Sequence, residues 1–186
     1  MLEEAKKELE SGNVISYPTE TVYGLGVDPR NEIAVEKLLK IKQRNSSISL
    51  IADSIETVNS LPIVETTSEL RLKLQDKHWP GALTLIVKLD IAKVNFSKKL
   101  LAKDQTIAIR VSSSDLARNL AGIAGGLITA TSANPKDLKP AKNKQESLDY
   151  FPKIYALKSE VNSQDMPSTI YSLVENKILR QGSINI

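Results

Sequence analysis

Short runs of strand-forming residues alternate with amphipathic helical stretches from one end of the chain to the other. The helical stretches lie at 2–9, 32–42, 54–60, 66–77, 114–121 and 145–151, and the strand-forming runs lie at 14–17, 50–52, 82–89, 106–111, 126–131 and 154–157. Helices that connect strands return the chain to the same sheet and cover it. The alternation therefore predicts an α/β fold: a twisted mixed sheet with helices on its faces.

Turn residues predict two further features of this fold. Pro18 cannot donate a ladder hydrogen bond, so the first strand is expected to end there and residues 19–26 to form a loop. Near the other end, the runs 168–174 and 177–181 are separated by two polar residues, which predicts a hairpin. Because the sequence contains no repeat and no shift in composition, residues 1–186 are expected to form a single domain.

The chain contains no cysteine and one histidine, His78. It therefore cannot build a zinc finger, a cysteine-ligated iron–sulfur site or a Cys/His nucleophile pair. No apolar run approaches the roughly 18 residues that a membrane span needs, so we expect a cytoplasmic protein with no membrane partner. A net charge of +3 and a pI near 9.0 are compatible with an anionic substrate or with a nucleic acid.

Two familiar nucleotide-binding motifs are missing from the sequence. No G-x-x-x-x-G-K-[ST] occurs, and Gly24-Leu25-Gly26 lacks the third glycine of a dinucleotide fingerprint, since Pro29 stands in its place. Candidate residues therefore come from loops and strand ends, where ligands usually bind in open α/β sheets. In the first such segment, Thr19 and Thr21 offer two hydroxyl groups next to glycines that permit tight backbone turns.

Cationic residues mark two more candidate segments. Lys42 and Arg44 stand at the end of a predicted helix, where they either grip a phosphate or complement the helix dipole. Thr106 and Arg110 are four residues apart on one strand and so share a face; Arg110 there either binds an anion or pairs with an acidic neighbour. Further hydroxyl, amide and guanidinium groups follow later strands; they are Ser132, Asn134, Ser168, Thr169 and Arg180.

Taken in order, these segments resemble the YrdC/TsaC family of L-threonylcarbamoyladenylate synthases over nearly the whole chain. The segments that carry the resemblance are Tyr17 to Gly26, Lys42-Gln43-Arg44, Trp79-Pro80-Gly81, Ile109-Arg110-Val111, Thr131 to Asn134, Pro167 to Ile170 and Arg180-Gln181-Gly182. The chain departs from the family pattern after Arg44, after Asn134 and at Ser172. The resemblance implies a YrdC-like fold in the short, single-domain form.

The resemblance also implies a reaction and a distribution of roles. L-threonine, bicarbonate and ATP would give threonylcarbamoyl-AMP and pyrophosphate, with Mg²⁺ accompanying ATP, and a separate transferase complex would move the threonylcarbamoyl group to tRNA. The residues expected to bind threonine are Thr19, Thr21, Arg110, Ser168 and Thr169; those expected to bind ATP are Lys42, Arg44, Thr106, Ser132, Asn134 and Arg180. Lys42, Arg44 and Arg110 are expected to be catalytic.

An alternative from a different class of protein is a non-catalytic module of the same fold that binds tRNA or double-stranded RNA. The feature that favours it is a cluster of lysines, at Lys136, Lys139, Lys142 and Lys144. Binding through lysines would weaken steeply with salt, whereas pyrophosphate release that depends on threonine would not require RNA. The two hypotheses are therefore separable by experiment.

Overall fold

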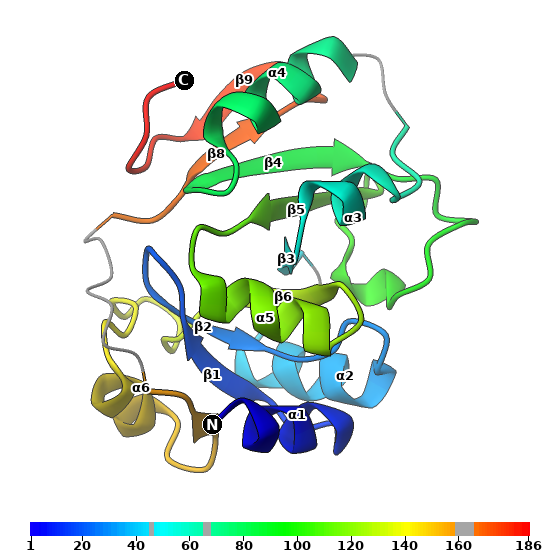
Figure 1. Ribbon diagram of the computed structural model, residues 1–186. Coiled ribbons are helices and arrows are strands. Elements are labelled where there is room, and N and C mark those ends of the chain that lie inside the picture. Colours follow the sequence, from blue (N-terminus) through cyan, green and yellow to red (C-terminus); the bar gives the residue numbers. More distant parts are fainter. Residues whose placement is uncertain (45–46, 65–67, 159–165) are drawn as a thin grey trace.

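The computed structural model describes residues 1–44, 47–64, 68–158 and 166–186, and the described chain is built on one nine-stranded sheet (Figure 1). The strands are β1 (Ile15–Pro18), β2 (Tyr23–Gly26), β3 (Ser49–Ala52), β4 (Leu83–Lys88), β5 (Thr106–Val111), β6 (Leu127–Ser132), β7 (Tyr155–Ala156), β8 (Thr169–Ser172) and β9 (Lys177–Arg180). Their order across the sheet is β7-β1-β2-β6-β3-β5-β4-β8-β9. The pairs β1–β7, β3–β5 and β4–β8 are parallel and the others antiparallel, so the sheet is mixed as predicted.

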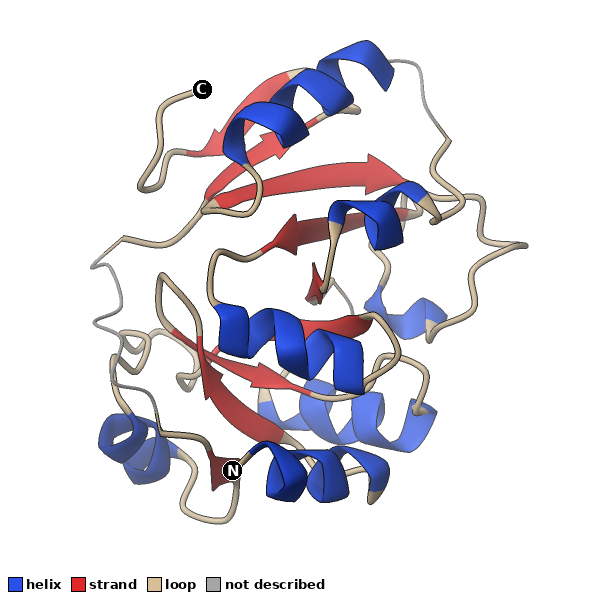
Figure 2. Ribbon diagram, in the orientation of Figure 1, coloured by secondary structure: helices blue, strands red, loops and turns tan. Residues whose placement is uncertain are grey.

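Helices cover both faces of this sheet (Figure 2). They are α1 (Leu2–Glu10), α2 (Glu32–Ile41), α3 (Ile55–Asn59), α4 (Ser68–His78), α5 (Asp115–Ile123) and α6 (Lys144–Tyr150), with a short 3₁₀ turn at Lys98–Leu100. Side-chain caps fix where several of them begin: Asn31, Ser54 and Ser114 each accept a hydrogen bond from a backbone N–H in the first turn of α2, α3 and α5. Part of the predicted helix 66–77 lies outside the described residues.

The core is divided by the sheet into two clusters. One contains Leu38 of α2 together with Leu50 and Ile109, and the other contains Leu120 of α5 together with Ile51. Neighbouring residues of β3 thus point to opposite faces, as the two-residue period of a strand requires. Side chains that share the face of Ile51 form the site described below.

One prediction about the N-terminal region was wrong. Residues 23–26 were expected to belong to a loop, yet they form β2, a buried strand that pairs antiparallel with β1. Gly26 serves close packing: a Cβ there would lie 2.6 Å from Cε1 of Tyr17 and 2.8 Å from the carbonyl oxygen of Thr129. Gly26 leaves room for the Tyr17 ring, which lies over the strand and donates a hydrogen bond to the same carbonyl.

Other predictions about the fold are confirmed. The C-terminal hairpin is present as β8 and β9, and the helices and strands follow the predicted order. In the described part of the chain, no helix is long and apolar enough to cross a membrane.

Candidate functional site

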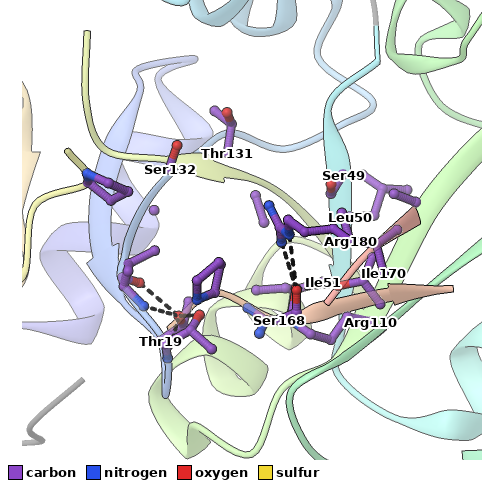
Figure 3. A pocket seen from close by; sticks show the side chains of 18 of the residues that line it. Thr19, Ser49, Leu50, Ile51, Arg110, Thr131, Ser132, Ser168, Ile170 and Arg180 are labelled. Atoms are coloured by element: carbon purple, nitrogen blue, oxygen red, sulfur yellow. Dashed lines mark hydrogen bonds between the residues drawn. The ribbon is translucent and has the colours of Figure 1, made fainter. Parts of the chain in front are cut away.

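A cavity of about 440 Å³ lies over the centre of the sheet (Figure 3). Its walls come from segments that are far apart in the sequence, including the loop after β1, the end of β6 and the segment before β8. Seven of the residues expected from the sequence line it: Thr19, Thr21, Arg44, Arg110, Ser132, Ser168 and Arg180. The fold therefore gathers most of the candidate residues into one place.

The register of the strands explains why these side chains meet. Ile51 of β3 pairs with Arg110 of β5, and Thr84 of β4 pairs with Ile170 of β8. Because β4 and β5 pair with Leu85 opposite Ile109, Thr84 lies opposite Arg110 when this register is continued by one residue. The four side chains form a row across the sheet on one face, and all four line the cavity.

The loop after β1 is held in shape by the hydroxyl of Thr19. This oxygen donates a hydrogen bond to the carbonyl of Val22 at 2.7 Å and accepts hydrogen bonds from the backbone N–H groups of Thr21 and Val22, each at 3.2 Å. It also lies 2.9 Å from the hydroxyl oxygen of Thr21. The bonds fix both hydroxyls at the cavity wall with their orientation already set (Figure 3).

Arg110 forms a buried ion pair at the floor of the cavity. Its Nη1 donates to Oε1 of Glu20 at 2.9 Å, and the two side chains are only 9% and 12% exposed. The second oxygen of Glu20 accepts a short hydrogen bond from the hydroxyl of Ser112. Arg110 therefore pairs with an acidic neighbour, which was one interpretation of its place in the sequence. It also lines the cavity, where it could bind an anion, so the two interpretations are compatible.

Arg180 supports the wall on the side of β8. Its Nη2 donates to the carbonyl oxygen of Ser168 at 2.9 Å, and the Ser168 hydroxyl lies 2.8 Å from that of Thr84 (Figure 3). Burial, with a smaller contribution from the charge of Arg110, lowers the pKa of Arg180. The positive charges of Arg110 and Arg180 disfavour each other, so an anion bound near both guanidinium groups would be favoured.

Lys42 is absent from the lining of the cavity. Its Nζ donates to the carbonyl oxygens of Ser132 and Asn134 at 2.7 and 2.6 Å and to Oδ1 of Asn134 at 3.3 Å. Asn134 also lies outside the lining, and its Nδ2 donates to the carbonyl of Leu138 at 2.6 Å. Lys42 thus contacts the segment that brings Ser132 to the cavity.

The protonation of Lys42 leads to a pH-dependence prediction. Burial, with a smaller effect from Arg44, lowers the pKa of Lys42 to about 8, and a neutral amine can donate only two of the three hydrogen bonds. We expect the activity of the wild type to fall above pH 8 relative to the activity of Lys42→Arg, because the arginine stays charged while Lys42 loses its proton. The measurement is the ratio of the two activities as a function of pH. The free energy of unfolding should not fall together with the activity. Lys42 loses its proton near pH 8 in the folded chain but only near 10.5 in the unfolded chain, so between these pH values its titration stabilises the folded chain as the pH rises. A constant ratio across this pH range would contradict the prediction.

Two further expected residues, Thr106 and Thr169, are absent from the lining of the cavity. Thr106 is at the opposite end of β5 from Arg110, about 13 Å along the strand, and its hydroxyl donates to Oδ1 of Asp104 at 2.7 Å. The hydroxyl of Thr169 donates to the carbonyl of Ile184 at 2.7 Å and accepts from the N–H of Gly182. Both side chains hold their own segments of backbone.

Ser49 and Thr84 are among the residues that line the cavity without having been selected from the sequence. Each is a hydroxyl residue with apolar neighbours in its strand, and Thr84 is only 4% exposed. A hydroxyl in a buried strand requires a partner, which is the signal that could have identified them.

The described residues include no group of three or more His, Asp or Glu side chains placed to hold a metal ion. The cavity therefore offers cations and hydroxyls, and its guanidinium groups belong to Arg44, Arg110 and Arg180. This combination suits a ligand with several negative charges that also carries hydrogen-bond acceptors.

Comparison with known proteins identifies the family. The family model for Sua5, YciO and YrdC proteins, described as "Telomere recombination", matches residues 7–182. The chain belongs to the Sua5/YciO/YrdC family. The resemblance noted in the sequence is therefore confirmed.

Curated members of the family are similar to this chain over nearly its whole length. A threonylcarbamoyl-AMP synthase of Saccharophagus degradans is 38% identical over 184 residues, covering 96% of this chain and 93% of the relative. A threonylcarbamoyl-AMP synthase of Vibrio vulnificus is 35% identical over 185 residues, covering 97% and 98%.

Solved structures of the family share the fold. Sua5 of P. abyssi, crystallised with L-threonine, matches with a TM-score of 0.85 and 25% identity over 96% of this chain, which spans 53% of the length of that protein. YciO of E. coli matches with a TM-score of 0.84 and 24% identity, covering 98% of this chain and 89% of YciO. The predicted fold class is thus confirmed by family members.

Proposed function

We propose that this chain is a threonylcarbamoyl-AMP synthase, a nucleotidyltransferase that converts L-threonine, bicarbonate and ATP into threonylcarbamoyl-AMP and pyrophosphate. The observation that carries the proposal is one cavity that combines three guanidinium groups with a series of hydroxyls, in a chain 35–39% identical to enzymes of that name. Bicarbonate takes up a proton and loses water to give CO₂, and the threonine amine then adds to the carbon of CO₂ and releases a proton to solvent. An oxygen of the resulting carbamate then attacks the α-phosphorus of ATP, and pyrophosphate leaves.

The two ends of the cavity differ in charge, which assigns a substrate to each. Arg110 lies beside the carboxylate of Glu20, so this end suits a zwitterionic amino acid. Arg44 is exposed and lines the cavity, as does Ser132, so a triphosphate would meet an uncompensated cation and a hydroxyl there. The amine of threonine and the α-phosphate would then meet between the two ends.

Catalysis in this proposal rests on position and charge. No side chain needs to form a covalent bond, because the nucleophile is the substrate's own carbamate. Holding the carbamate and the α-phosphorus together can supply roughly 7–11 kcal/mol of the barrier. Fixed cations lower the barrier further, because they stabilise the negative charge that develops on the phosphoryl oxygens.

The remaining partners follow from the reaction. Mg²⁺ would enter bound to the triphosphate, as part of the substrate, because Mg²⁺ prefers phosphate oxygens and water to an all-protein site. The product is a reactive mixed anhydride, so a tRNA threonylcarbamoyl transferase complex in the same compartment, the cytoplasm, would consume it.

The test is pyrophosphate release by the purified chain. We expect release with ATP, Mg²⁺, L-threonine and bicarbonate together, and background release when threonine or bicarbonate is left out. Release that is indifferent to threonine would refute the proposal, since ATP hydrolysis alone also gives phosphate products.

The RNA-binding alternative keeps one observation in its favour. Lys136, Lys139, Lys142 and Lys144 are all exposed, and they flank Pro140, which lines the cavity. If the chain releases no pyrophosphate and binds double-stranded RNA with an affinity that falls steeply as the salt concentration rises, as expected of lysines that contact phosphates, this alternative replaces the synthase.

A further inference from the structure

Glu20 is a buried carboxylate beside the cavity whose role is not explained by substrate contact. It is absent from the cavity lining, although the residues on either side of it, Thr19 and Thr21, line the wall. Both of its oxygens point to β5 and the segment after it, where they accept hydrogen bonds from Arg110 and from the fully buried Ser112. Glu20 thus links two walls of the site that are 90 residues apart in sequence.

This link fixes the geometry of Arg110. A guanidinium has five donors, and the described hydrogen bonds use only Nη1, which donates to Glu20. Because that bond is buried and charge-assisted, it holds the plane of the guanidinium while other donors remain for a ligand in the cavity. The hydroxyl of Ser112 holds the carboxylate from the other side, and Ser112 itself accepts from the N–H of Ser114 at 3.2 Å.

The ion pair with Glu20 also makes Arg110 different from the other arginines that line the cavity. Among the ion pairs of the described residues, Arg110 has an acidic partner, whereas none is found for Arg44 or Arg180. The pair formed by Arg110 and Glu20 is neutral overall. The single carboxylate of an amino acid can pair with the Arg110 donors that Glu20 does not use, whereas a phosphate, which carries more negative charge, would be repelled more strongly by the Glu20 carboxylate.

We infer that Glu20 is a positioning residue that reserves Arg110 for the α-carboxylate of the amino acid and keeps phosphate groups away from it. The inference rests on the proposed function, because it assigns the amino acid to this end of the cavity. In its absence Arg110 would become a mobile cation open to ATP or pyrophosphate, and the two substrates would compete for one subsite.

The experiment compares Glu20→Gln with the wild type. We expect the KM for threonine to rise about tenfold or more while the KM for ATP changes less than about twofold, since one lost charge contact corresponds to about a tenfold change in affinity. Pyrophosphate, which should not compete with threonine in the wild type, should become a competitive inhibitor against threonine in Glu20→Gln. Glu20→Asp keeps the charge but shortens the side chain, so it should raise the threonine KM without admitting pyrophosphate.

The outcomes separate this inference from the proposed function. Thermal melting of each variant shows that the kinetics are measured on folded protein; if Glu20→Gln does not fold, the rise of the threonine KM at a nearly constant ATP KM in Glu20→Asp is the test. Equal changes in both KM values in either variant, or no competition by pyrophosphate in Glu20→Gln, would overturn the role of Glu20 while leaving the synthase intact. A wild type that makes no product would overturn the synthase; calorimetric titration of wild type and Glu20→Gln with threonine and with pyrophosphate would then test Glu20 alone.

Discussion

Replacing Arg110 with alanine is expected to lower kcat/KM for threonine by roughly 10²- to 10³-fold. The guanidinium is the buried cation at the amino-acid end of the cavity, and its removal takes away the partner of the substrate carboxylate. The same change leaves the carboxylate of Glu20 buried without its cation, which should also cost about 3–5 kcal/mol of stability. Steady-state kinetics and thermal unfolding measure the two effects.

A double variant separates activity from folding. Arg110→Met combined with Glu20→Gln removes both charges and keeps most of the side-chain volume, so we expect it to recover much of the lost stability. It should remain as inactive as Arg110→Ala. If the double variant regains activity together with stability, Arg110 acts through the fold alone and does not bind substrate.

Replacing Gly182 with alanine is expected to have the largest structural effect of a single methyl group in this chain. A Cβ there would lie 2.2 Å from the carbonyl oxygen of Pro167, 2.4 Å from the carbonyl carbon of Ser168 and 2.5 Å from the backbone nitrogen of Thr169. These are backbone atoms, so the segment itself must move, and Pro167 and Ser168 line the cavity. We expect a loss of roughly 3 kcal/mol of stability and of most activity.

The matched control is Gly122→Ala. Gly122 lies within α5, where an added Cβ would meet only the Asp53 side chain at 3.8 Å, an ordinary contact. Alanine is the better helix former, so this variant should be more stable by about 0.5–1 kcal/mol and fully active. Equal melting temperatures for the two alanine variants would show that the contacts around Gly182 do not constrain the backbone.

The fold was predictable from the sequence because its signals are local. A few neighbouring residues are enough to indicate each helix or strand, the caps at Asn31 and Ser114, and the C-terminal hairpin. β2 was missed because Gly24 and Gly26 suggest a turn locally. Gly26 is required by the ring of Tyr17 on the adjacent strand, which a local pattern does not show.

The sequence pointed to seven of the residues that line the cavity, but not to the partners of the candidate residues. Strand periodicity correctly puts Thr106 and Arg110 on one face, but it cannot show that the cavity lies over only one end of β5. Likewise, the partners of Lys42 and Arg110 lie about 90 residues away in sequence, so only the folded chain reveals them. Such long-range hydrogen bonds depend on strand order and register, which single-sequence patterns do not determine.

The most direct test of the central claim is the identity of the nucleotide product. The purified chain is incubated with ATP, Mg²⁺, L-threonine and carbon-13 bicarbonate, and the products are identified by mass spectrometry. We expect an adenylate that contains one threonine and one labelled carbon, formed in equal amount with pyrophosphate. Pyrophosphate accompanied only by AMP, or by a threonine adenylate without the label, would contradict this expectation.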